Sequence, residues 1–442
     1  MPRRPGKPRA QRPAKAISAS VKIGFIPLTD CVVLLAAKEK GFFRRHGLDV
    51  ELSREPSWAN VRDKVALGAL DAAHMLAPMP LAATLGAGGW RKQQIVSFVL
   101  ALNGNAITIS TALWQRLLEI EPNLANKRAD GSSVLRKLIA KDRKDGKPKL
   151  TLATVFNYSS HQIQLRYWLA AAGIDPDHDV NLVVVPPPQM TDRLAAGEID
   201  GFCVGDPWNS LAVLRGVGRI LISGQEIWNN RMEKVIGVNR DWAERNPLVL
   251  KAMTMALIEA AEWLDKPENR LEGVEILAKP EYIGPYAADA IRLGMLGVVR
   301  YGLDEAPEHM PDFHVFNRYT ANFPWRSQAE WYLGEMRRWH LVDPGTDISA
   351  LADVVYRPDI YREAAAALDR PFPLIDRKPE GLHAGHWILG QATAPIEMGP
   401  DLFFDGSYFS SARMGAQPVR DSHAEPAITA IRSKSPNRPA NR

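Results

Sequence analysis

The chain has 442 residues, which is too long for a single compact core, so we expect two lobes with extensions. An apolar fraction of 46% beside 24% charged residues is ordinary for a folded protein, and two cysteines exclude a disulfide framework or a cysteine-based metal centre. The net charge of +5 lies at the two ends, because residues 21–416 hold 44 basic and 48 acidic residues. We therefore interpret the ends as disordered, solubilising tails and expect no direct nucleic-acid partner.

The body of the chain alternates between strand-like and helix-like patterns. In chain order we predict strands over 21–27, 48–55, 71–77, within 91–110, and over 151–157, 180–187 and 200–205. Helices are predicted over 30–47 (ending at Gly41 or slightly later), 57–70, 78–88, within 111–149, and over 159–173, 190–199 and 206–216. A strand and a long helix are predicted within 233–264, and helices with loops over 285–350. This alternation predicts an α/β fold with mainly parallel sheets and helices on both faces.

The start of the chain lacks the pattern of an export signal. The basic first segment is followed by a stretch that Lys22, Pro27 and Asp30 interrupt, so it contains no continuous apolar run. No stretch elsewhere approaches the roughly 20 apolar residues of a membrane span. We therefore expect a cytoplasmic protein without a membrane partner.

Four strand-to-helix junctions share one design, with a capping residue or a proline just after the strand. In an open α/β sheet this edge is where ligands bind, and helix N-termini there attract anions. Each junction alone is ordinarily just a capped helix, whereas four of them in two α/β units favour an anion-binding cleft. The junctions are 27–30, 77–80, 157–160 and 205–208.

Two side chains are candidates for holding the anion. His161 falls in the first turn of a predicted helix, where a neutral imidazole is favoured and could donate one N–H; its alternative is a structural hydrogen bond. Lys234 enters a predicted strand and supplies the single cation we expect, although most lysines are simply solvated. Trp58 and Trp208 could line the cleft or belong to the core. No nucleophile, metal-ligand or nucleotide motif is present, so we expect no catalytic residues, no metal and no cofactor.

These motifs together resemble a known family. The segments VKIGFIPLTDCVVLLAAKEKGFFRRHGLDVEL, SWANVRDKVALGALDAAHMLAPMP, LRYWLAAAGIDPDHDVNLVVVPPPQM and DGFCVGDPWN resemble the nitrate- and bicarbonate-binding proteins of ABC transporters (NrtA- and CmpA-like) over residues 21–370. The resemblance implies a two-lobed periplasmic-binding-protein-like fold of type II with a hinge, and binding without catalysis. It also implies the ligand residues, which are Lys234, His161, Gln162, Gly205, Asp206, Trp208, Met75 (where transporter members have a cleft tryptophan) and Pro78.

The resemblance also suggests a partner. The expected absence of an export segment favours the NasS-type cytoplasmic nitrate/nitrite sensors, which hold a NasT-like antiterminator of the ANTAR type and release it when the anion binds. The alternative is the substrate-binding component of a transporter for nitrate, bicarbonate or a related anion. A pyrimidine-synthesising enzyme of the same fold is a weaker third option, because it needs a cysteine-rich iron motif.

The same comparison divides the chain into five regions. They are a basic tail over 1–20, a first lobe over 21–104 plus 230–350, a second lobe over 105–229, a C-terminal extension packing on the first lobe over 351–415, and a basic tail over 416–442.

Overall fold

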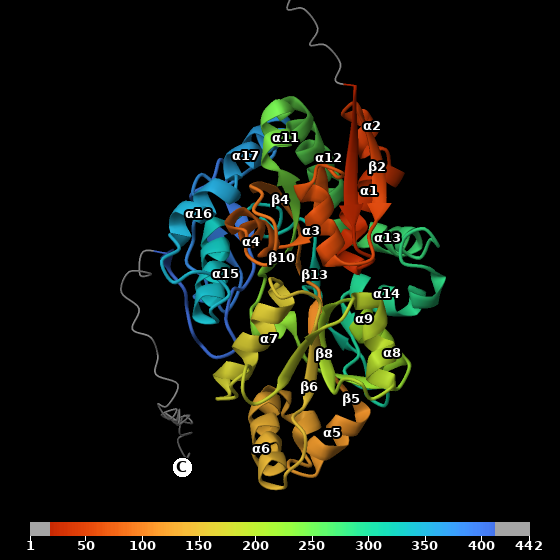
Figure 1. Ribbon diagram of the computed structural model, residues 1–442. Helices are drawn as coiled ribbons and strands as arrows, with labels where there is room; N and C mark the ends of the chain where they lie inside the picture. The colour runs from red at the N-terminus through yellow and green to blue at the C-terminus, as the bar shows by residue number, and fades with distance from the viewer. Residues whose placement is uncertain (1–17, 412–442) are drawn as a thin grey trace, which may run out of the picture.

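The computed structural model describes residues 18–411, and these form two α/β lobes, one above the other in Figure 1. Each lobe is built on its own sheet, and the chain passes between the sheets twice. The predicted tails lie outside the described residues, apart from residues 18–20. Within residues 18–411, no helix combines the length and the apolar character needed to cross a bilayer.

The first lobe contains a six-stranded sheet in the order β13-β4-β10-β3-β1-β2. Its strands are β1 (Ala19–Phe25), β2 (Leu48–Arg54), β3 (Ala72–Leu76), β4 (Gln94–Asn103), β10 (Met232–Asn239) and β13 (His314–Val315). Its helices are α1 (Val32–Glu39), α2 (Phe42–Arg45), α3 (Trp58–Ala66), α4 (Met79–Leu85), α11 (Arg240–Arg245), α12 (Pro247–Asp265), α13 (Arg270–Leu277), α15 (Arg326–Arg338), α16 (Ile348–Val355) and α17 (Pro358–Ala367). The break between α1 and α2 falls at Gly41, whose φ of +74° suits glycine.

The second lobe contains a five-stranded sheet in the order β7-β6-β8-β5-β9. Its strands are β5 (Asn105–Ser110), β6 (Thr151–Thr154), β7 (Asn181–Val184), β8 (Gly201–Gly205) and β9 (Gly218–Ser223). Its helices are α5 (Thr111–Leu118), α6 (Gly131–Lys144), α7 (Ser160–Ala171), α8 (Met190–Ala195), α9 (Trp208–Leu214) and α10 (Gly224–Ile227). Helix α7 begins where the Ser159 hydroxyl caps the backbone N–H of Gln162.

The two crossings between the lobes shape both sheets. Strand β4 continues into β5 through Gly104, and the segment after α10 leads into β10. Because β10 and β5 enter their sheets from the opposite lobe, they run antiparallel to their neighbours. The prediction of mainly parallel sheets is therefore wrong: in the described chain, two of the five pairings in the first sheet and two of the four in the second are parallel.

Part of the segment assigned to the first lobe also packs on the second lobe. Helix α14 (Ala288–Met295) lies against α9, and Val299 and Tyr301 share an apolar cluster with Val213 and Ile220. The short strands β11 (Val298–Val299) and β12 (Glu308–His309) belong to the same region. This excursion was not predicted, because an apolar helix in the sequence does not show which lobe it packs against.

The C-terminal extension likewise reaches both lobes. Near α17 it is held by Asp376, which accepts bonds from Arg326 and Arg362 at 2.5 Å each. It then forms a small hairpin of β14 (Trp387–Leu389) and β15 (Ile396–Met398) and continues to α7, where Tyr167 donates to Asp405 at 2.9 Å. In Figure 1 this blue segment runs beside α15 toward α7. The extension, predicted to pack on the first lobe, thus also contacts the second lobe.

Candidate functional site

The two crossings bring a group of buried charges to the seam between the lobes. At its centre is Lys234 on β10, whose side chain has no solvent-exposed surface. Its Nζ lies 2.9 Å from Asp30 Oδ2 and 2.8 Å from Glu233 Oε1. The cation predicted from the sequence is thus buried between the lobes, and two carboxylates already neutralise it.

Glu233 connects this cluster to the second lobe. Its Oε1 lies 2.7 Å from His161 Nε2 and accepts a bond from Ser160 Oγ at 2.7 Å, both in the first turn of α7. Its Oε2 accepts from Asn105 Nδ2 at 3.2 Å and pairs with Arg231. One carboxylate therefore gathers donors from β5, β10 and α7.

Asp30 connects the cluster to the first lobe in the same way that Glu233 connects it to the second. Its Oδ1 lies 2.9 Å from His74 Nε2 on β3, and the other ring nitrogen of His74 accepts a long bond of 3.4 Å from the backbone N–H of Ile26. The Trp58 ring lies over this pair, 5.3 Å from the His74 ring and 6.0 Å from Lys234 Nζ. Trp58, which was left open between core and cleft, thus lies against the charged cluster.

Arg231 supplies a second buried cation. Its guanidinium donates to Asn105 Oδ1 and to Gln164 Oε1, each at 2.7 Å, and to the Tyr332 hydroxyl at 3.3 Å. The expectation of a single cation is therefore corrected. Asp30 and Glu233 balance Arg231 and Lys234, so the four charged groups sum to zero.

Burial and these ion pairs together set the protonation states. Burial would raise the pKa of Glu233, but Arg231 and Lys234 outweigh it and hold that pKa well below its usual value. Burial would lower the pKa of Lys234, yet its two carboxylates raise it. For His161, burial prevails and lowers the pKa, so the ring is neutral at physiological pH, as predicted, although burial and not the helix terminus is the main cause.

Asp206 stands apart from these ion pairs. Its carboxylate accepts bonds from Ser210 Oγ at 2.9 Å and from Asn209 Nδ2 at 3.5 Å, within the first turn of α9. Burial raises the pKa of Asp206 to about 7. Its backbone carbonyl accepts from the Thr29 N–H at 2.8 Å, which joins the two lobes. The preceding Gly205 faces Asp30, because a Cβ there would lie 3.5 Å from Asp30 Oδ2.

Other predicted site residues lie outside the cluster. Gln162 accepts from Thr154 Oγ1 at 2.5 Å, and Gln164, half a turn further along α7, contacts Arg231 instead. Met75 packs against Gly237, where an added Cβ would collide with its sulfur, whereas its neighbour His74 points to Asp30.

The two remaining predicted residues lie at helix starts. Pro78 begins α4, and Trp208 begins α9, where its ring lies 6.4 Å from the Tyr286 ring. Both side chains are buried, and neither has a recorded polar bond to Lys234.

Sequence reasoning missed five members of the cluster. Two sequence features could have indicated some of them. The Arg-Met-Glu-Lys run places three charges at the start of an otherwise apolar strand, and an aspartate follows the first strand. The contacts among these residues join positions far apart in the chain, and no local sequence pattern reveals such contacts. The missed members are Asp30, His74, Asn105, Arg231 and Glu233.

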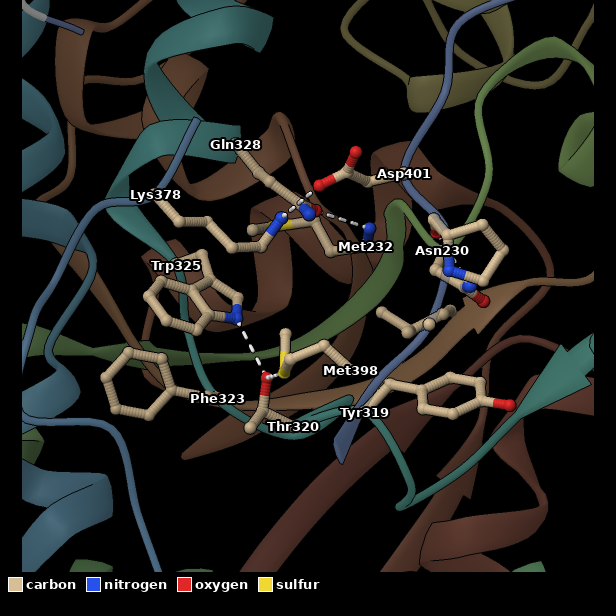
Figure 2. Close-up of a pocket in the computed structure, with 13 residues that line it drawn as sticks. Asn230, Met232, Tyr319, Thr320, Phe323, Trp325, Gln328, Lys378, Met398 and Asp401 are labelled. Carbon is tan, nitrogen blue, oxygen red and sulfur yellow. Dashed lines mark hydrogen bonds and ion pairs between the residues drawn. The ribbon is translucent and has the colours of Figure 1, made fainter. Parts of the chain in front are cut away.

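Two hollows lie near the seam. An open groove of about 360 Å³ is lined by residues of both lobes, among them Pro27, Arg54 and Gln189. An enclosed cavity of about 20 Å³ lies behind β10, where the C-terminal extension closes over it (Figure 2). Lys378 and Asp401 line this cavity, which has room for about one water molecule and is too small for a planar oxyanion. Within residues 18–411, no cluster of His, Cys, Asp and Glu has the arrangement of a metal site.

Comparison with known proteins places these features in context. Residues 14–278 match the NMT1-like family. A crystal structure of the periplasmic nitrate-binding protein NrtA from Synechocystis PCC 6803 superposes with a TM-score of 0.78 at 31% identity, covering 90% of this chain and 97% of that chain. The two lobes are therefore those of a type II periplasmic-binding-protein fold, which confirms the predicted fold class.

Two sequence relatives support the same family relationship. The nitrate/nitrite binding protein NrtA of a Nostoc species is 34% identical over 360 residues, covering 80% of this chain and 78% of the relative. The nitrate import ATP-binding protein NrtC of a Synechocystis species is 40% identical over 354 residues, but the chain spans only 51% of its length. The binding proteins among these relatives are named for binding and not for catalysis, in line with the prediction that this chain is not an enzyme.

Proposed function

The chain belongs to the NMT1-like family and to its NrtA-type solute-binding proteins, and from this premise we propose that it binds nitrate or nitrite between its lobes, next to Lys234. Both anions are planar, carry one negative charge and only accept hydrogen bonds. A site for them therefore needs donors and a cation, and it needs no general base.

The observation that carries this proposal is the buried Lys234 ammonium at the seam, where both lobes contribute donors. Several buried donors nearby also lack a hydrogen-bond partner within the described chain: Thr29 Oγ1, Trp58 Nε1 and Trp208 Nε1. An unpartnered buried donor is costly, and an anion is a ligand that could satisfy it. An anion held by both lobes would also favour their closed arrangement.

A thermal shift series tests the proposal. Nitrate or nitrite should raise the melting temperature, because a ligand at a hundredfold excess over its Kd stabilises the folded state by about 2.7 kcal/mol. Chloride and sulfate at the same ionic strength serve as controls. Equal shifts with all four salts would show a general salt effect and contradict a specific site.

Two uses of such binding remain to be separated. The relatives are components of transporters, which favours a role as the substrate-binding component of an ABC transporter for nitrate or a related anion. The second candidate is a cytoplasmic sensor that holds a NasT-like antiterminator of the ANTAR type and releases it when the anion binds. The hinged lobes support it, because a partner that prefers the open form must lose affinity when the anion favours the closed one.

Gel filtration of the chain mixed with a NasT-like protein distinguishes these roles. The sensor role requires a complex without nitrate that dissociates at millimolar nitrate, and it requires the chain in the cytoplasmic fraction of cells. A chain recovered outside the cytoplasm, or a mixture that forms no complex in either condition, would leave the transport role.

A further inference from the structure

The ring of His161 is buried, and its Nδ1 has neither a hydrogen-bond partner nor an ion-pair partner within the described chain, whereas its Nε2 lies beside a carboxylate. Its Nε2 lies 2.7 Å from a carboxylate oxygen of Glu233, and because a carboxylate only accepts, this proximity favours the tautomer with the ring hydrogen on Nε2. In the neutral ring Nδ1 then carries a lone pair. That atom is buried and unpartnered. Nitrate and nitrite also present only lone pairs, so the neutral ring cannot donate from Nδ1 to either anion.

The charges around His161 lead to the same conclusion. Asp30 and Glu233 cancel Arg231 and Lys234, so the cluster is neutral before any anion arrives. All four side chains are buried, with at most 2% of any of them exposed. A monoanion would leave one uncompensated negative charge away from water, which is strongly unfavourable.

We propose that the site binds the anion together with one proton, which His161 takes up from solvent at Nδ1. This inference rests on the proposed binding of nitrate or nitrite and specifies how the site achieves it. The added proton turns the imidazole into an imidazolium, and no bond in the anion is made or broken. The proton supplies both the missing positive charge and a second N–H for an anion oxygen.

Other titratable groups face the same cluster from every side, and they are weaker candidates for the proton. His74 Nδ1 accepts from the Ile26 N–H and its Nε2 lies 2.9 Å from Asp30 Oδ1, and the ion pairs keep Asp30 and Glu233 ionised. Asp206 and His314 are the main competitors, because burial raises the pKa of Asp206 to about 7 and both ring nitrogens of His314 are unpartnered within the described chain. The full set comprises Asp30, His74, Cys203, Asp206, Arg231, Glu233, Lys234, His314 and Tyr332.

Linked protonation has a measurable signature. Burial lowers the pKa of His161 in the free protein, so the ring is neutral at pH 7 to 8 and each binding event should take up close to one proton. While the bound ring stays protonated, the Kd for nitrate should rise about tenfold for each unit of pH in that range.

Titration calorimetry with sodium nitrate tests this directly. The heat of binding measured in HEPES, imidazole and Tris at pH 7.5 should vary with the ionisation enthalpy of the buffer, with a slope of about one proton taken up. The variant His161→Gln keeps an amide donor but cannot gain a proton, so its binding should be weaker, independent of pH and free of proton uptake. The control His178→Gln changes an exposed histidine and should match the wild type.

The outcomes separate the inference from the proposed function. Nitrate binding by the wild type without proton uptake would overturn the inference and leave the proposed function intact. No nitrate binding at any pH would defeat the proposed function itself. Uptake of one proton by His161→Gln would assign the proton to another group, such as Asp206. If that variant does not fold, the ¹⁵N shifts of the His161 ring in the wild type decide the matter, because they distinguish imidazole from imidazolium in the nitrate-saturated protein.

Discussion

At the scale of single residues, Lys234 is both the proposed cation for the ligand and a partner in two buried ion pairs, and only the first role was predicted from the sequence. Seen only as a cation for the ligand, it would be expected to leave the fold intact when replaced. The structure instead shows it bonded to Asp30 and Glu233 in a fully buried position. Its removal would leave two carboxylates short of a counter-charge.

We therefore expect Lys234→Met to destabilise the protein as well as to abolish anion binding. Breaking a buried ion pair by removing one partner costs about 3–5 kcal/mol. Urea unfolding measures the change. Lys92→Met is the matched control, because Lys92 pairs with Asp241 at the surface and should contribute at most about 1 kcal/mol. Equal stability of the two variants would show that the buried pairs do not support the fold.

Asp206 should make stability depend on pH in a direction unusual for an aspartate. Its pKa is about 7 in the folded protein, against about 3.9 when unfolded, so the folded state holds the proton more tightly. The stabilisation is fully present below pH 4 and is lost as pH rises through 7, by up to about 4 kcal/mol. Asp206→Asn should remove this loss, so that the variant gains stability relative to wild type between pH 5 and 8. An unchanged difference between the two proteins over that range would rule out the raised pKa.

At the scale of elements, two loops from opposite lobes approach each other closely. Gly88, in the loop before β4, has a φ of +70° and lies against Tyr158, in the loop before α7 of the other lobe. A Cβ at Gly88 would collide with the tyrosine ring when the lobes are closed.

We expect Gly88→Ala to weaken anion binding about tenfold, equivalent to about 1.4 kcal/mol, because it disfavours the closed form. Gly68→Ala is the matched control: Gly68 has a φ of +75° and nothing within 4 Å of an added Cβ. Both variants should lose about 1–2 kcal/mol of stability to backbone strain, and only Gly88→Ala should lose affinity. Restored affinity in the double variant Gly88→Ala, Tyr158→Ala would assign the effect to the loop contact. Calorimetry with nitrate measures all three.

The elements also show what sequence reasoning can and cannot reach. The helices that begin at Ser160 and Trp208 were predictable, because each follows a clear strand and a capping or proline residue. The prediction named Met75, whereas the structure brings its neighbour His74 to Asp30, because on a strand one position reverses the face. The prediction named Gln162, whereas Gln164 contacts Arg231; this helix is buried nearly all round, so periodicity does not mark which face meets the cluster.

At the scale of the whole molecule, pairing across distant segments was out of reach of the sequence. Asp30, Asn105, His161 and Lys234 lie on four different elements and meet only after both crossings are made. The excursion of α14 and the path of the C-terminal extension were missed for the same reason. Their contacts are with surfaces that exist only once both lobes have folded.

The end of that extension holds an aromatic cluster that we expect to matter for stability. Phe403 stacks on Trp228 with ring centres 4.5 Å apart and also meets Trp331 and Tyr167. Phe403→Ala should cost about 3–5 kcal/mol in chemical unfolding, the usual range for a buried ring. Ile388→Ala, on an exposed side chain of the same extension, should cost far less. A small loss in both variants would mean that the aromatic cluster is not tightly packed.

The extension also bears on how fast the protein exchanges its ligand. It is hydrogen-bonded near α17 on one lobe and to Tyr167 of α7 on the other. Full separation of the lobes would therefore require one of these hydrogen-bonded contacts to break. We expect the barrier to that event to slow both entry and escape, and so to lengthen the dwell time of a bound anion without a change in Kd. The fraction of molecules with bound anion would then follow the anion concentration averaged over the dwell time, and it would not respond to changes in concentration that are shorter than the dwell time.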